Sequence, residues 1–216
     1  MLGLPLSKTN GRSLTVLCLG AHSDDIEIGC GGTMLRLLDH YNCHVHWVVF
    51  SAHRIRRREA TLGARLFLRG AKTKNVLIRS HRDGFFPYQG VKIKDQFERM
   101  GRAVDPDLIF THYRNDLHQD HRLINELTWN TFRSHLILEY EIPKYDGDLG
   151  SPNFFVELVE SVSRMKIAHL RRAFPSQGNK HWFTEDLFSA LMRLRGVEAR
   201  SSTGFAEAFY ARKVRV

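Results

Sequence analysis

An alternation of short apolar runs with helical patterns limits the fold of this chain more than any other feature. Each run typical of a buried strand is followed by a segment whose apolar residues recur at helical spacing. We predict strands at 14–19, 45–50, 75–79, 108–111, 136–140 and 207–216, and helices at 33–41, 56–68, 97–104, 121–132 and 156–172. Such alternation favours a mainly parallel sheet with helices on both faces, a Rossmann-like three-layer α/β fold.

The composition fits one domain spanning residues 1–216. The chain has 216 residues, 43% of them hydrophobic, with no repeat or linker, so a full core is expected. The apolar run at 14–19 is too short to cross a bilayer, and residues 1–13 lack the apolar core of a signal peptide. We therefore expect no transmembrane segment and a cytoplasmic protein. Cys18, Cys30 and Cys43 have no C-x-x-C spacing and are interpreted as reduced thiols.

The charge is strongly positive. The chain has 32 Lys and Arg against 23 Asp and Glu, a formal net charge of +9. Much of it lies in two helical stretches, at 54–58 and 164–172, where charge runs are usually solvated faces. The alternative is attraction of an anionic substrate, such as a sugar nucleotide or a lipid-linked sugar phosphate.

Two polar loops follow the first and fourth predicted strands. Ligands of doubly wound sheets bind beyond the carboxyl ends of the strands, where the strand order reverses. The loop at 21–27 reads Ala-His-Ser-Asp-Asp-Ile-Glu, and the loop at 112–121 ends in His118-Gln119-Asp120-His121. We expect both loops to meet at one crevice.

Both loops carry metal-ligand residue types. His22 and Asp25 can point at one ion from a tight turn, although Asp24 or Asp25 could instead cap a helix. His118 and His121 have short metal-site spacing. Two His and one carboxylate form a known zinc set that leaves a position open for water. The competing feature is the glycine run at 29–32, which could cradle a phosphate but lacks the full dinucleotide-binding pattern.

These residues resemble the PIG-L or LmbE-like N-acetylglucosaminyl deacetylases. The usual motifs of that family are Ala-His-Pro-Asp-Asp-Glu and His-x-Asp-His, and this chain has Ala21-His22-Ser23-Asp24-Asp25-Ile26-Glu27 and His118-Gln119-Asp120-His121. Weaker similarities lie at 56–60, 106–111, 139–141, 166, 176–177 and 206–209. Ser23 replaces the usual Pro, and Ile26 displaces the acidic residue to Glu27. Neither change removes a ligand.

The resemblance implies a zinc-dependent N-deacetylase acting on an N-acetylated amino sugar, free or linked to an anionic carrier. His22, Asp25 and His121 would bind one Zn²⁺ or another divalent transition metal. Asp24 would be the general base, and His118, oriented by Asp120, the acid and oxyanion stabiliser. Arg56 could contact substrate in the crevice or be an exposed helix arginine, and Asp116 could bind sugar hydroxyls or support a metal-bound His.

Three further expectations complete the sequence interpretation. One alternative is an amidase acting on a larger amino-sugar conjugate, and another is a non-catalytic nucleotide-binding α/β domain. A homo-oligomer is possible, because α/β enzymes of this kind commonly assemble, although the sequence leaves the oligomeric state open. No nucleic-acid partner is expected.

Overall fold

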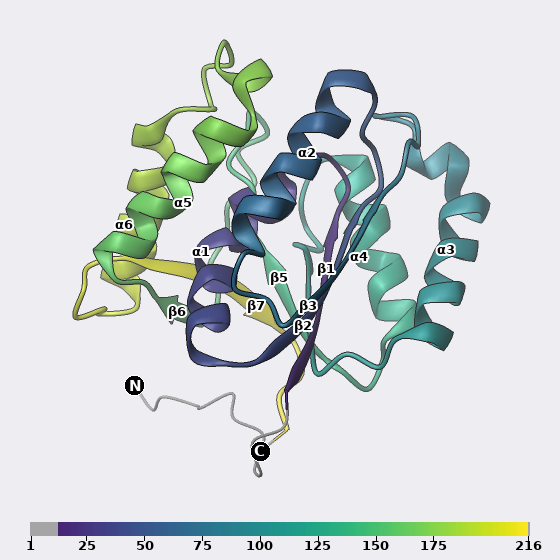
Figure 1. Cartoon of the computed structure of the whole chain (residues 1–216), viewed down its shortest axis with the longest axis horizontal. Coiled ribbons are helices and arrows are strands. Elements are labelled where there is room, and N and C mark those ends of the chain that lie inside the picture. The colour runs from purple at the N-terminus through teal and green to yellow at the C-terminus, as the bar shows by residue number, and fades with distance from the viewer. Residues whose placement is uncertain (1–12, 216) are drawn as a thin grey trace.

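A seven-stranded sheet forms the centre of the computed structural model, which describes residues 13–215 (Figure 1). The strands are β1 (Leu14–Gly20), β2 (Cys43–Val49), β3 (Thr73–Ile78), β4 (Leu108–His112), β5 (Leu136–Tyr140), β6 (Phe154–Glu157) and β7 (Ala206–Ala211). Their order is β3-β2-β1-β4-β5-β7-β6. Strands β1 to β5 are parallel, while β7 runs antiparallel to both β5 and β6. The order reverses between β1 and β4, as expected.

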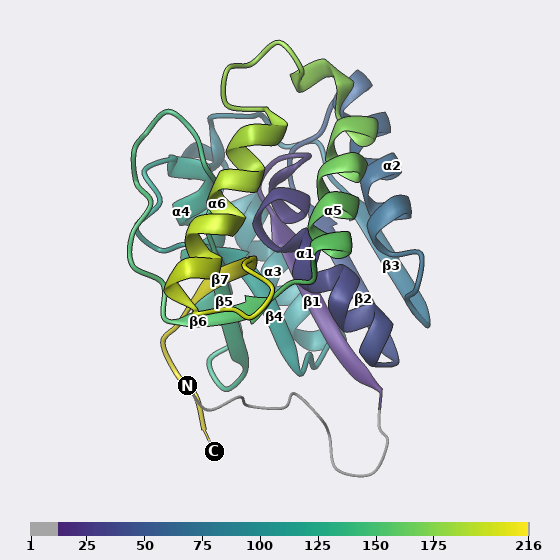
Figure 2. The ribbon, with the colours of Figure 1, turned by 90° about the vertical axis from the view of Figure 1, so that its left-hand side faces the viewer.

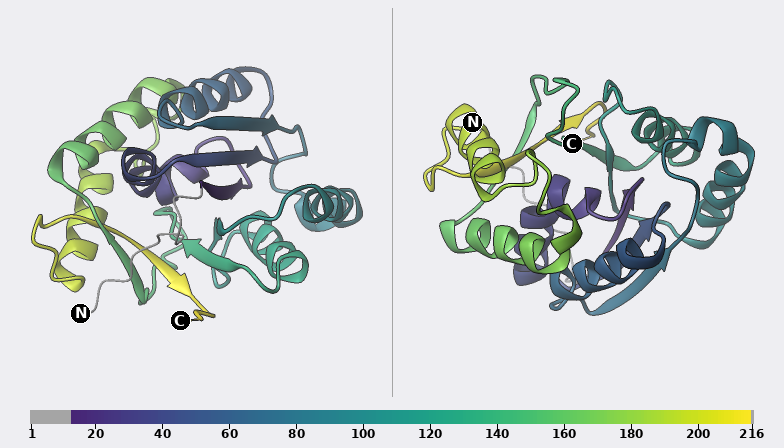
Figure 3. Two further views of the ribbon diagram at one scale, coloured as in Figure 1. Left: turned by 60° about the horizontal axis from the view of Figure 1, so that its bottom comes forward. Right: turned by 90° about the horizontal axis from the view of Figure 1, so that it is seen from above.

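Helices cover both faces of this sheet, which confirms the predicted three-layer architecture (Figure 3). The helices are α1 (Asp25–His40), α2 (Arg54–Phe67), α3 (Gly90–Ala103), α4 (Gln119–Thr131), α5 (Glu160–Ala173) and α6 (Glu185–Glu198), with short 3-10 turns η1 (Phe86–Gln89) and η2 (Pro175–Gln177). One core holds side chains of α1, α2, α5 and α6, and the other holds side chains of α3, α4 and η1. Figure 2 views the molecule from the side on which α5 and α6 lie.

The central strand β1 serves both cores because successive side chains of a strand point to opposite faces. Val16 and Cys18 pack into the first core, and Leu17 and Leu19 into the second. A strand buried on both faces ends in a loop whose position is fixed by packing. The loop after β1 is therefore a firm support for polar side chains.

The prediction that the first helix begins at Thr33 is wrong, because α1 already begins at Asp25. The glycine run lies inside this helix, where Cys30 has non-helical backbone angles (φ −139°, ψ 15°). A Cβ at Gly29 would lie 2.2 Å from Tyr140 Cδ2, so glycine is required by close packing. The amides of Gly32 and Thr33 donate to the Glu207 carboxylate at 2.8 and 2.6 Å. The protein's own carboxylate thus occupies the place that a phosphate would take.

The C-terminal half also departs from prediction. The helix predicted at 156–172 is present as α5, but its first residues belong to the short edge strand β6, and α6 was not predicted. Helix α3 begins at Gly90, seven residues before the predicted 97, because η1 leads directly into it. The last strand ends at Ala211 rather than at 216, and residue 216 lies outside the described range, as do residues 1–12.

The charged stretches divide between surface and interior. Arg54, Arg57 and Arg58 are exposed, as a solvated helix face requires. Lys166 is buried and pairs with Glu207 at 2.5 Å, so it does not belong to a solvated face. The three cysteines are buried and unpaired, in agreement with the prediction of free thiols. No helix among residues 13–215 combines the length and the apolar character needed to cross a membrane.

Candidate active site

A cleft of about 480 Å³ opens at the carboxyl edge of the sheet, where the loops after β1 and β4 meet. Its lining includes most of the candidate residues: His22, Asp24, Asp25, Arg56, His118 and His121. Asp116 and Asp120 lie behind this lining and are almost fully buried. The two loops predicted to meet from ninety residues apart therefore do so.

The donor atoms of His22, Asp25 and His121 converge on one point. His22 Nδ1 lies 3.1 Å from His121 Nε2 and 3.5 Å from Asp25 Oδ2, and the last two atoms are 3.6 Å apart. Two ligands about 2.1 Å from a zinc ion at the tetrahedral angle lie about 3.4 Å apart. The spacing of the three donors thus fits one small divalent ion. Other donor groups within 4.8 Å of one another overlap this set, and His121 belongs to two of them: His22/His118/His121 and Asp25/His112/His121.

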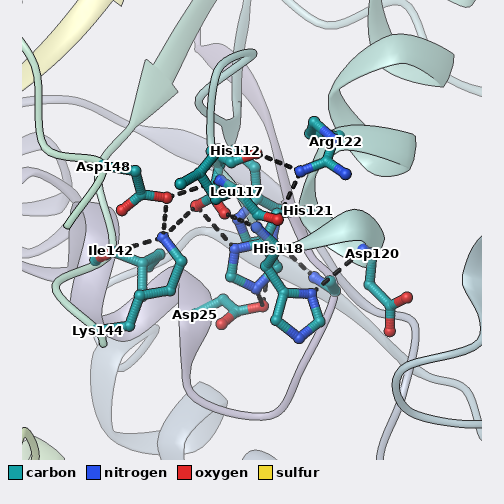
Figure 4. Close-up of polar contacts among 12 residues, drawn as sticks. Asp25, His112, Leu117, His118, Asp120, His121, Arg122, Ile142, Lys144 and Asp148 are labelled. Carbon is teal, nitrogen blue, oxygen red and sulfur yellow. Dashed lines mark hydrogen bonds and ion pairs between the residues drawn. The ribbon is translucent and has the colours of Figure 1, made fainter. Parts of the chain in front are cut away.

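Asp116 holds His121 from behind. Its Oδ2 lies 2.9 Å from His121 Nδ1, which leaves Nε2 of that ring facing His22 and Asp25. Lys144 Nζ lies 3.0 Å from the same oxygen and also pairs with Asp148 (Figure 4). Although burial acts to raise the pKa of Asp116, the hydrogen bond with His121 and the nearby Lys144 keep it well below its ordinary value. These contacts favour support of His121 over contact with sugar hydroxyls.

Asp120 supports the other histidine. His22 Nε2 lies 3.2 Å from Asp120 Oδ2 and 3.0 Å from Asp83 Oδ1. The same carboxylate accepts from the amides of Gly84 and Phe86 at 2.7 and 3.0 Å. Histidine ligands commonly donate their second N–H to a carboxylate, which fixes the ring and its tautomer. The carboxylate of Asp120 therefore orients His22 and secures the turn before η1.

His118 is oriented by the backbone of Asp120. His118 is the N-cap of α4, and its Nδ1 accepts from the Asp120 amide at 3.2 Å. An accepting Nδ1 carries no proton, so a neutral His118 carries its proton on Nε2 and can donate from there. Burial and the neighbouring His22 lower the pKa of His118. The resemblance implied that Asp120 orients this ring, and the contact that does so is the main-chain one.

Asp24 stands beside the donor cluster and pairs with Arg56. Its Oδ1 lies 2.8 Å from Arg56 Nη2, while its Oδ2 is buried and has no hydrogen-bond partner in the described part of the chain. Asp24 occupies the N-cap position of α1 but makes no capping bond, so the expectation of a cap is not met. Burial raises the pKa of Asp24, and the Arg56 guanidinium opposes that rise. Arg56 also pairs with Glu59 at 2.6 Å, so this residue of the cleft wall has a carboxylate partner in both Asp24 and Glu59.

The cluster carries more negative than positive charge. Its carboxylates belong to Asp24, Asp25, Asp83, Asp116 and Asp120, and its permanent cations to Arg56 and Lys144. Although burial acts to lower the pKa of His22, the carboxylates of Asp25, Asp120 and Asp83 raise it well above its ordinary value. Burial and the nearby His112 lower the pKa of His121 to about 3, so this ring keeps a free lone pair. A divalent cation would balance the excess charge, and the donors present fit one.

Sequence reasoning missed three supporting residues. His112 is buried at the end of β4, with Nε2 3.2 Å from Asp25 Oδ2 and 2.9 Å from the Ala21 amide. Asp83 and Lys144 complete the contacts of His22 and Asp116. His112 carried a usable signal, because it ends a strand next to the crevice. The other two lie in loops whose position no periodicity reveals.

Glu27 lies outside the cleft, as its displacement by Ile26 suggested. It is fully buried, both of its carboxylate oxygens lack hydrogen-bond partners among residues 13–215, and burial raises its pKa well above the ordinary value. A Cβ at Gly63 would lie 2.2 Å from Glu27 Oε1, so α2 packs directly on this carboxyl group.

An α/β sheet with a His/Asp cluster at its switch point defines a class of α/β proteins with a candidate metal site at the carboxyl edge. Within it, the family model described as "GlcNAc-PI de-N-acetylase", PIG-L, matches residues 17–132. The chain belongs to the PIG-L family.

Solved structures share the fold at low sequence identity. N,N'-diacetylchitobiose deacetylase from Pyrococcus horikoshii is 21% identical, with a TM-score of 0.71 over 92% of this chain and 84% of that one. A conserved protein from Thermus thermophilus is 20% identical, with a TM-score of 0.71 over 94% and 96%. A teicoplanin deacetylase in a zinc-inhibited form is 13% identical, with a TM-score of 0.65 over 91% and 97%. At these identities the likeness concerns the fold.

Proposed function

We propose that this protein is a metal-dependent N-deacetylase that hydrolyses the acetamide of an N-acetylated amino sugar. The observation that carries the proposal is the convergence of His22, Asp25 and His121 in one cleft with Asp24 and His118. Membership of the PIG-L family and the deacetylase activity named for two of the fold relatives support it.

His22, Asp25 and His121 would hold one Zn²⁺ or another divalent transition ion. A bound divalent ion supplies a Lewis acid, which polarises a carbonyl oxygen and makes water more acidic. Asp116 and Asp120 fix the two imidazole rings so that each presents a free lone pair. The excess of carboxylates in the cluster is compatible with the positive charge of a divalent ion.

The remaining residues would move protons and hold the developing charge. Asp24 takes a proton from the attacking water, whose oxygen bonds to the acyl carbon. His118 donates from Nε2 to the oxyanion, and losing one such donor typically costs about 10²- to 10³-fold in rate. When the C–N bond breaks, the proton that Asp24 took from the water passes to the sugar nitrogen and acetate leaves, because an amide nitrogen anion is a very poor leaving group.

The cleft suits a small substrate with room beyond the acetamide. Its volume of about 480 Å³ falls within the range of small-molecule sites, roughly 300–1,000 Å³. Trp182, Tyr145 and Lys180 line its outer part, where they could contact a sugar ring and an anionic carrier. A contact of Arg56 with substrate, a homo-oligomer and a cytoplasmic location stay predictions.

The test of this function compares Asp24→Asn with Asp39→Asn, a matched change at an exposed residue of α1. Purified protein is expected to hold about one zinc per chain, because the three donors form a single set. Asp24→Asn should keep that metal and lose at least about 10²-fold in acetate release, the typical contribution of a general base. Full activity in Asp24→Asn would contradict the role assigned to this residue.

The substrate is best identified by measuring free amine from a panel of N-acetyl sugars, nucleotide-linked N-acetyl sugars and larger amide conjugates. Activity on larger conjugates alone would favour the amidase alternative. The nucleotide-binding alternative is weakened at the end of the glycine run, since the amides of Gly32 and Thr33 are already bound to Glu207.

A further inference from the structure

The rim of the cleft is built from segments that follow the parallel strands. These rim segments are residues 51–58, 79–92, 113–122 and 143–148, joined by residues 175–183 between α5 and α6. They lie along the upper side of the molecule in Figure 1. Because parallel strands end at the same edge of a sheet, all of these segments face one direction.

Side-chain and main-chain bonds join the rim segments into one surface. Ser51 Oγ donates to His81 O at 2.8 Å, which joins the first segment to the second. The Gly84 and Leu117 amides bind Asp120 and Asp148, which joins the second to the third and the third to the fourth. Ser176 donates to Glu59 at the first turns of α2. The rim is therefore continuous and held in place.

Half of the large apolar side chains that stay exposed among residues 13–215 lie on this rim. The exposed set has twelve members, and six of them are rim residues: Ile55, Phe85, Tyr88, Val91, Leu117 and Tyr145. Tyr88 is 84% exposed and Val91 79%. Exposed apolar groups that gather around a site mark an interaction surface, because burying them against a partner is favourable.

The exposure of Phe85 and Tyr88 is built into the turn that carries them. Between them Phe86 is fully buried, with its ring 5.9 Å from the His22 ring and its amide bonded to Asp120. Arg82 lies over the Phe85 ring at 3.5 Å, and the Phe85 and Tyr88 rings are 6.0 Å apart. The buried anchor prevents these rings from turning inward, so they stand outward together with a guanidinium.

The rim is also strongly basic. Exposed cations include Arg54, Arg57, Arg58, Arg82, Lys92 and Lys180, whereas the exposed carboxylates of these segments are Asp83 and Asp146. Apolar side chains mixed with arginine and lysine on one surface match an anionic lipid interface, where the rings enter the headgroup region and the cations meet lipid phosphates. A nucleic acid would use the cations and leave the apolar side chains without a partner.

We propose that the rim of the cleft docks onto an anionic lipid surface. Docking is peripheral and rests on Tyr88, Val91 and their neighbours together with the basic start of α2. It does not depend on deacetylation, so it can be tested on the protein without substrate.

The experiment is cosedimentation of the full chain with vesicles of phosphatidylcholine, with and without one third phosphatidylglycerol. We expect binding to the anionic vesicles at about 0.1 M salt and little at about 1 M, where the screening length falls from about 10 to about 3 Å. A DNA duplex is the competing partner. Binding to DNA without binding to anionic vesicles would overturn the proposal, and so would no vesicle binding at the lower salt.

Matched variants locate the surface. Val91→Ser should lower vesicle affinity, whereas Val197→Ser, 70% exposed near the end of α6, should not. Arg58→Glu should lower it at least roughly five-fold, and Arg65→Glu, two turns further along α2, should change it less. Equal losses in a variant and its control would refute the assignment. Loss of self-association in Val91→Ser without vesicle binding would instead identify a second copy as the partner.

Discussion

Replacing Asp116 with asparagine tests whether the cluster is a metal site, without measuring activity. The change keeps the shape of the side chain but removes its charge. In the wild type, Asp116 Oδ2 lies 2.9 Å from His121 Nδ1 and 3.0 Å from Lys144 Nζ, in a fully buried setting. The amide oxygen of asparagine could accept from His121 only as a neutral partner, so the ring would lose a charge-assisted bond and part of its basicity.

The expected size follows from these contacts. Bonds to charged groups are worth about 1.5–3 kcal/mol, and loss of a carboxylate behind a ligand histidine typically weakens metal binding about 10- to 100-fold. A factor of 10 to 100 corresponds to about 1.4–2.7 kcal/mol. Both routes give the same range. We therefore expect the zinc dissociation constant of Asp116→Asn to rise by about one to two orders of magnitude.

The assay is competition for zinc against a chromophoric chelator, with the fold of the metal-free protein checked by circular dichroism. Asp148→Asn is the matched control, because Asp148 contacts Lys144 and not His121. This variant should weaken zinc binding less. A folded Asp116→Asn that binds zinc as tightly as the wild type would refute the assignment of His121 as a ligand.

Three further predictions concern the support of the site. Lys166→Met should destabilise the protein by about 3–5 kcal/mol, since it leaves the buried Glu207 charge without its positive partner. Denaturant unfolding measures this loss, provided that the slope of the unfolding free energy against denaturant stays the same. An unchanged free energy of unfolding would show that the pair is dispensable. Gly29→Ala should lower the free energy of unfolding by about 1–3 kcal/mol because its Cβ overpacks against Tyr140. Gly90→Ala, whose Cβ meets nothing within 4 Å, should not destabilise the protein. Equal thermal midpoints for the two variants would contradict the packing argument. Burial raises the pKa of Cys43 to about 11, so native protein at neutral pH should react with a thiol reagent only slowly and faster as pH rises toward that value, and rapid labelling at neutral pH would contradict the burial.

The architecture was predictable because its strongest signal is periodic. Five parallel strands alternate with helices, and the two chemistry-bearing loops follow neighbouring strands, so their meeting could be inferred without coordinates. The first residues of α1 were not predictable in this way. Glycines at 29, 31 and 32 are typical of loops, and only the rings of Tyr140 and Phe67 and the side chains of Leu158 and Glu207, packed against them, explain why they lie in a helix.

The sequence predicted the residues that supply the metal-donor atoms better than the residues that hold them in place. His22, Asp25 and His121 stand in compact motifs, and the structure brings their donor atoms together. Asp83 and Lys144 come from loops between elements, whose course depends on contacts distant in the chain. The contact of the Asp120 carboxylate with His22, rather than with His118, depends on the direction of a side chain at a helix start, which a sequence pattern does not specify.

Every proposed ligand and the proposed base lie before residue 132, where the family match ends, yet the helix that starts among them is clamped from the other end of the chain. Glu207 binds the amides of Gly32 and Thr33, and Lys166 reaches the carbonyl of Ile28. A fragment cut at the boundary of the match would keep all of its chemistry and lose these clamps. The half of the sequence that carries the proposed site thus relies on the later half for its shape, and changes in β7 or α5, far from the cleft, are expected to disturb that site.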